Sequence, residues 1–70
     1  MKLGTKSFRG IVKLKNGKMY GGLVNMIGNW VRIVNCYVYN FVNLRWEKTH
    51  KVIVHSSEVE KITEVERCTI

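Results

Sequence analysis

The chain has 70 residues. A domain of this length buries only about 60% of its unfolded surface, and its core alone supplies roughly 3–5 kcal/mol of net stability. This size excludes an enzyme that carries its own cofactor-binding domain, and a hydrophobic fraction of 46% excludes a disordered chain. Lys and Arg outnumber Asp and Glu by 12 to 5, which gives a formal net charge of +7. We therefore expect an acidic partner.

Residue types that favour β-strands dominate the composition. Val, Ile, Thr and the aromatic residues fill 27 of the 70 positions, whereas Ala, Pro, Asp and Gln are absent. Branched and aromatic side chains lose rotamer freedom in helices and pack well on a pleated sheet. The composition therefore predicts an all-β fold.

The first predicted element is a β-hairpin. Residues 8–15 alternate between apolar and basic side chains with a period of two, as expected for a half-buried strand. Asn16-Gly17 follows, and this pair is the strongest short-range signal of a hairpin turn because both residues tolerate positive φ. Residues 18–27 form the returning strand, in which Gly21-Gly22 predicts the sharp bend that a small barrel needs.

The remaining predicted strands span residues 29–39, 48–55 and 58–65. In the first of these, strict alternation places Cys36 on the same face as Arg32, and both faces are largely apolar. A strand covered by its own barrel on one side and by a neighbouring subunit on the other would have this pattern. Residues 40–49 are predicted as an irregular loop. Its apolar residues, Trp46 with Phe41 and Tyr39 nearby, form either a small core under the loop or a docking patch for another protein.

Five short strands without room for a crossover helix indicate a small five-stranded SH3-like barrel. We expect this barrel to occupy residues 8–65, between an N-terminal tail at 1–7 and a C-terminal tail at 66–70. No apolar run is long enough to cross a membrane as a helix, and the first seven residues contain no apolar stretch typical of a signal peptide. A cytoplasmic protein is the expectation.

The positive charge is concentrated in the first two thirds of the chain. Residues 1–46 contain eight Lys and Arg and no acid, whereas residues 47–70 contain the other four basic residues and all five Glu. A one-sided positive field attracts phosphate polymers through counterion release, which favours nucleic acid over a charge that only keeps the protein in solution. Lys13, Lys15 and Lys18 flank the predicted hairpin turn and form a candidate basic patch.

Two segments carry motif spacings of a known family. They are Val12-Lys13-Leu14-Lys15-Asn16-Gly17 followed by Gly22, and Val52-Ile53-Val54, His55-Ser56-Ser57 and Val59-Glu60-Lys61-Ile62. These segments resemble the first and second motifs of the Sm/Lsm superfamily, which includes the bacterial Hfq-type proteins. The chain departs from the family in the loop after the second strand, where an Asp and a Met-Asn pair are usual, and at His55-Ser56, where Arg-Gly or Lys-His is usual.

The resemblance implies a ring that binds single-stranded RNA. Members of the superfamily form rings of five to seven subunits, in which the fourth strand of one barrel pairs with the fifth strand of the next. They bind RNA around the pore through the loop after the second strand and the turn before the last strand. By position, the corresponding residues of this chain are Asn29, Trp30, Arg32, His55 and Ser56.

Each of these residues also has a structural interpretation. Trp30 either stacks on an unpaired base or packs in the core, and Asn29 either reads a base edge or forms a turn. Arg32 either contacts phosphate or pairs with one of the late Glu residues. His55 and Ser56 are more often hydrogen-bonded turn residues than RNA contacts.

No catalytic site, metal site or cofactor is predicted. The chain has no Asp, its Ser-His neighbours lack an orienting acid and an oxyanion hole, and its two His and two Cys lack the spacing of a zinc site. Cys36 and Cys68 are expected to be reduced thiols. Three functions remain open: an RNA-binding ring, a barrel that binds duplex DNA through a basic face, and a structural or adaptor oligomer without a nucleic-acid role.

Overall fold

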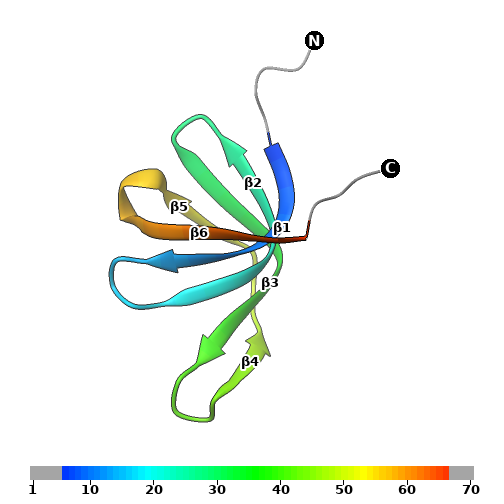
Figure 1. Cartoon of the computed structure of the whole chain (residues 1–70), viewed down its shortest axis with the longest axis vertical. Coiled ribbons are helices and arrows are strands. Elements are labelled where there is room, and N and C mark those ends of the chain that lie inside the picture. Colours follow the sequence, from blue (N-terminus) through cyan, green and yellow to red (C-terminus); the bar gives the residue numbers. More distant parts are fainter. Residues whose placement is uncertain (1–5, 67–70) are drawn as a thin grey trace.

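The computed structural model describes residues 6–66 as an antiparallel sheet of six strands and one short 3-10 helix (Figure 1). The elements are β1 (Lys6–Leu14), β2 (Met19–Ile27), β3 (Trp30–Asn40), β4 (Arg45–Lys48), β5 (Val52–His55), η1 (Ser56–Glu58) and β6 (Val59–Glu66). The strand order is β4-β3-β2-β1-β6, and β5 also pairs with β3. The all-β prediction is confirmed, and the arrangement is compatible with a small β-barrel. No helix in residues 6–66 is long and apolar enough to cross a membrane.

The sheet has six strands instead of the predicted five: β5 covers only the second half of the strand expected at 48–55, and an additional strand, β4, precedes it. β4 pairs with the last part of β3, from Tyr37 to Asn40, and β5 pairs with its first part, from Trp30 to Ile33. The irregular loop predicted for 40–49 is likewise wrong over Arg45–Lys48, which is β4. β3 bends between its two paired parts, so one straight partner strand cannot follow both of them.

The bend lies at a bulge shared by β2 and β3. The register shifts between Gly21 and Leu23, and Asn35 adopts a positive φ of 49°. Gly22 has a φ of 152°, and a Cβ at this position would lie 2.6 Å from the carbonyl oxygen of Val34. The bulge reverses the alternation along β3, so Cys36 is buried and not on the face of Arg32.

The core lies on the inner face of the curved sheet. Its buried side chains are Val12, Leu14, Val24, Val31, Ile33 and Cys36. Side chains of all three long strands of the β1–β2–β3 meander contribute, and partly buried residues of β5 and β6 pack against them. We call the opposite side of the sheet the outer face.

The β1–β2 hairpin turns at Asn16-Gly17, as predicted. The amide of Gly17 donates to the carbonyl of Leu14 at 3.0 Å, and the Asn16 side chain accepts from the amide of Lys18 at 3.0 Å. Gly17 has a φ of 97°, a conformation that glycine adopts without a steric penalty. β1 begins at Lys6, two residues before the predicted strand.

Candidate nucleic-acid interface

The structure brings four of the five predicted RNA-contact residues together. The β2–β3 turn and the β5–η1 turn lie side by side, because Trp30 pairs with His55 across β3 and β5. The two rings meet edge to face, with centroids 5.0 Å apart. The amide of Ser56 donates to the carbonyl of Asn29 at 2.8 Å, which ties the two turns together.

His55 and Ser56 hold this end of the sheet in place. Nδ1 of His55 accepts from the amide of Ser57 at 3.1 Å and lies 2.9 Å from its hydroxyl, so His55 caps η1. Ser56 uses its backbone amide for the contact with the other turn. These contacts give both residues a structural role, the alternative that the sequence left open.

Trp30 and Asn29 are available for a ligand. The side chain of Trp30 is 52% exposed, so the core-packing interpretation is wrong, and Asn29 is exposed in the turn beside it. The turn itself is made by Gly28, which has a φ of 60°. An exposed indole next to an exposed amide is a pairing suited to stacking on a base and reading its edge.

Arg32 lies two residues further along β3, on the same outer face as Trp30. Its register neighbours are Asn25 on β2 and Ile53 on β5. Nε of Arg32 is buried and has no hydrogen-bond partner among the described residues, and Asn25 already accepts from the hydroxyl of Ser7. The ion pair with a late Glu, the structural alternative for Arg32, is not formed within that part of the chain.

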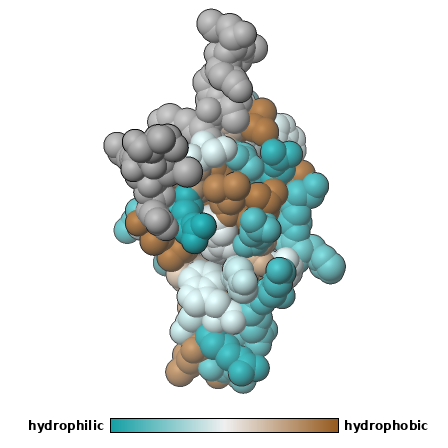
Figure 2. All heavy atoms as spheres, turned by 90° about the vertical axis from the view of Figure 1, so that its right-hand side faces the viewer, coloured by the Kyte–Doolittle hydropathy of each residue, from teal (hydrophilic) through white to brown (hydrophobic). Residues whose placement is uncertain are grey.

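Apolar side chains surround Arg32 and Trp30 on the outer face. Ile27 on β2 and Ile53 on β5 are both large and exposed. On the side of the molecule drawn in Figure 2, apolar and polar surface alternate over short distances. Nε of Arg32 is shielded from water, and a desolvated charge attracts an anion more strongly.

The predicted basic patch lies at the other end of β2. Lys13, Lys15 and Lys18 are exposed around the β1–β2 hairpin, and the nine residues of β2 place them about 25 Å from the β2–β3 turn. Lys61 of β6 pairs with Lys13 and enlarges the patch. Sequence reasoning missed Lys61 because its position depends on the pairing of the first and last strands.

The thiol chemistry of Cys36 is suppressed by its position. Burial raises the pKa of the Cys36 thiol, so the reactive thiolate is disfavoured. Cys68 lies outside the described residues, and the expectation for that thiol stays a prediction. Within residues 6–66, no three His, Cys, Asp or Glu side chains gather where they could hold a metal ion.

Comparisons of the chain with protein-family models, with curated proteins and with solved structures found no match.

Proposed function

We propose that this protein is an Sm-like, ring-forming protein that binds single-stranded RNA through Asn29, Trp30 and Arg32. The observation that carries the proposal is the buried, unpartnered Nε of Arg32 beside an exposed indole. A buried donor without a partner costs about 1–3 kcal/mol, and a phosphate or a base acceptor removes that cost.

The chemistry of the three residues is complementary. Trp30 offers a face on which a base stacks, a contact worth about 1–3 kcal/mol. Arg32 follows at the next position on the same face and supplies the positive charge for the backbone of the strand. Duplexes keep their bases stacked inside, so this arrangement favours a single strand over duplex DNA.

Assembly into a ring of five to seven subunits is part of the proposal. β5 pairs with β3, and β6 pairs with β1. The other edge of β5 and the other edge of β6 have no described pairing partner. An open edge favours pairing with another chain, and a core this small is stabilised by association. A ring carries one copy of the weak site in every subunit. Once one site is occupied, the neighbouring sites bind the same RNA strand at a high effective concentration, which raises the overall affinity.

The test is a binding comparison at one fixed salt concentration. Wild-type protein is titrated into labelled uridine-rich RNA, adenine-rich RNA and a mixed-sequence DNA duplex, with Arg32→Ala and Arg45→Ala as variants. Arg45 is the matched control because its side chain is 70% exposed on β4. Arg32→Ala should weaken RNA binding by about 1–3 kcal/mol per engaged subunit, whereas Arg45→Ala should have little effect. Binding of RNA no tighter than that of the duplex contradicts the proposal.

A second candidate, a protein-binding module, is favoured by the tip of the β3–β4 hairpin. Val42 is 89% exposed, and Phe41 and Leu44 beside it are also exposed. Figure 1 shows this hairpin extending away from the other strands. The same comparison separates the two functions, because a module of this kind has no reason to prefer single-stranded RNA.

A further inference from the structure

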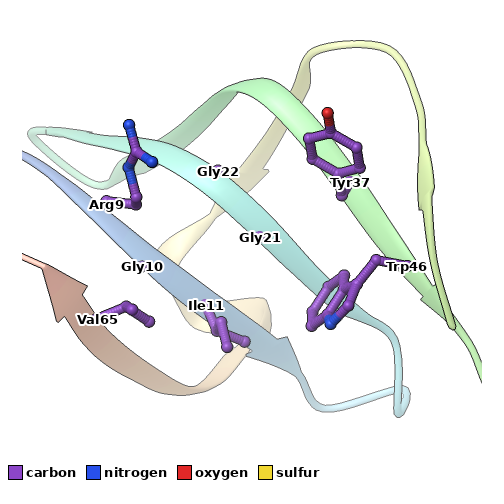
Figure 3. Close-up of a pocket in the computed structure, with 8 residues that line it drawn as sticks. All are labelled: Arg9, Gly10, Ile11, Gly21, Gly22, Tyr37, Trp46 and Val65. Atoms are coloured by element: carbon purple, nitrogen blue, oxygen red, sulfur yellow. The ribbon is translucent and has the colours of Figure 1, made fainter.

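A groove on the outer face lies apart from the residues of the proposed RNA site. It has a volume of about 390 Å³ and is formed where β1, β2, β3, β4 and β6 meet. Ile11, Tyr37, Trp46 and Val65 provide most of its apolar side chains, and Arg9 lies at its rim (Figure 3). A cavity of this volume is large enough for a flat ring system.

The floor of the groove is bare backbone. A Cβ at Gly21 would lie 3.4 Å from the ring of Trp46, so the indole rests against β2 where a side chain is missing. Gly10 and Gly22 are required for a different reason. A Cβ at either position would lie 2.6 Å from a carbonyl oxygen of the neighbouring strand. The bend of the sheet therefore requires Gly10 and Gly22, and the groove forms because these positions carry no side chain.

Two aromatic rings line the groove and remain accessible. Trp46 is 38% exposed and Tyr37 is 42% exposed, although both belong to paired strands. Figure 3 shows the Trp46 ring against β2 near Gly21 and the Tyr37 ring over the neighbouring strand β3. Their exposed faces and the flat floor fit a planar aromatic group better than a branched aliphatic one.

The charge around the groove is complementary to phosphate. On this face, the residues that pair in register include five basic ones: Arg9, Lys13, Arg32, Lys48 and Lys61. Lys48 is the direct neighbour of Tyr37. Aromatic rings interleaved with basic side chains are the arrangement that binds single strands, and an apolar peptide would gain nothing from these charges.

We propose that the groove binds a second unstacked base of the same RNA strand, between Tyr37 and Trp46. This inference rests on the proposed function and extends its site along the outer face. Trp30 and Tyr37 are seven residues apart on β3, which corresponds to about 20 Å. A single strand of several nucleotides spans that distance and engages both sites.

The experiment uses the two tryptophans as separate reporters. In Trp30→Phe the emission comes from Trp46 in the groove, and in Trp46→Phe it comes from Trp30 in the turn. Both variants of the full chain are titrated with single-stranded uridine-rich and adenine-rich RNA and with a duplex of the same length. We expect single strands to quench both emissions and the duplex to quench neither.

The outcomes separate the two proposals. Quenching of Trp30 without quenching of Trp46 overturns the groove and leaves the proposed function intact. Quenching of Trp46 alone supports the groove and contradicts the turn site. If neither emission changes and no RNA is bound, both proposals fail.

A second measurement does not depend on fluorescence. Tyr37→Leu removes a ring from the groove, and Phe41→Leu removes a similarly exposed ring from the hairpin tip. The affinity for RNA should fall about 5- to 150-fold in Tyr37→Leu and stay within about twofold in Phe41→Leu. Equal affinities of the two variants overturn the inference.

Discussion

Two of the glycines with positive φ, Gly17 and Gly22, are constrained for different reasons. Gly17 has a φ of 97° in the hairpin turn, and an added Cβ there would meet nothing within 4 Å. Gly22 combines a φ of 152° with an added Cβ that would lie 2.6 Å from the Val34 carbonyl oxygen. At Gly17 only the backbone conformation disfavours a side chain. At Gly22 the close approach of β2 and β3 disfavours it as well.

Gly22→Ala should therefore destabilise the protein much more than Gly17→Ala. We expect about 1 kcal/mol for Gly17→Ala and more than about 3 kcal/mol for Gly22→Ala, because a backbone clash adds to the conformational cost. Urea unfolding followed by far-ultraviolet circular dichroism measures both. Equal losses would mean that the bulge shifts to accept a methyl group.

Arg32 illustrates a conflict between stability and binding at a single residue. Arg32→Met keeps an unbranched side chain that ends where Nε stands, and it removes the guanidinium with its buried, unpartnered Nε. The free energy of unfolding should rise by about 1 kcal/mol, while the affinity for RNA should fall. Arg45→Met serves as the control: it removes only an exposed ion pair with Glu47, so the free energy of unfolding should change by less than about 1 kcal/mol and the affinity for RNA should stay the same. A lower stability of Arg32→Met would show that the guanidinium is satisfied in the free protein.

At the scale of elements, the side chain of Asn40 makes three hydrogen bonds within the β3–β4 hairpin. The Asn40 amide oxygen accepts from the backbone amides of Val42 and Asn43 at 2.8 and 2.9 Å, and its nitrogen donates to Glu47 at 3.2 Å. The ring of Tyr39 packs edge to face on Phe41 and on Trp46. The exposed apolar tip is thus presented by an ordered turn, although Leu44 adopts a φ of 57°.

The order of this hairpin should depend on pH. The hydrogen bond from Asn40 lowers the pKa of Glu47 below its ordinary value of 4.5. Desolvation opposes this shift, and Asn43 and Arg45 contribute smaller effects that also lower the pKa. A lowered pKa in the folded state means that the ionised carboxylate stabilises the hairpin above the ordinary value. This contribution is lost as the pH falls through the lowered pKa.

Amide exchange of Val42 and Asn43 measures this dependence. After correction for intrinsic exchange, their protection should decrease from roughly pH 6 to pH 3 in the wild type. In Glu47→Gln it should be lower at neutral pH and nearly constant over this range. Glu58→Gln, outside the hairpin in η1, should follow the wild type. A Glu47→Gln profile identical to the wild type would contradict the role of this carboxylate.

Local patterns predicted the elements that depend on neighbouring residues. Period-two alternation and Asn16-Gly17 located β1, the first turn and β2 within two residues. Alternation failed at the bulge near Asn35, because an extra residue there is required by the partner strand and not by local preference. The division into β4 and β5 depends on the same bend, so the sequence pattern did not contain it.

The candidate site shows the same division between local and distant information. The motif resemblance pointed to the two turns that the structure ties together through Ser56 and Asn29. The unpartnered state of Arg32 and the groove under Trp46 depend on cross-strand register, so sequence reasoning did not reveal them.

For the whole molecule, the open strand edges should determine the mass in solution. Ile53 is an exposed apolar residue on β5, and Val42 is an exposed apolar residue at the hairpin tip. Light scattering coupled to gel filtration should give a mass of five to seven subunits for the wild type. Ile53→Lys should lower this mass, because a charge beside the edge disfavours pairing with another chain, whereas Val42→Lys should leave it unchanged. A wild-type monomer at micromolar concentration contradicts the ring.

The pairing of β1 with β6 also has a kinetic consequence. Val12 pairs with Ile62, so the sheet is completed by two segments that are far apart along the chain, whereas its other long strands form local hairpins. Pairing β1 with β6 closes a long loop, and the entropic cost of this closure arises before the contacts between the two strands stabilise the sheet. During synthesis the β1–β2–β3 meander can form while β6 is still in the ribosome, with the edge of β1 temporarily unpaired. The edge of β1 is thus protected from pairing with a neighbouring nascent chain only after β6 has paired with it.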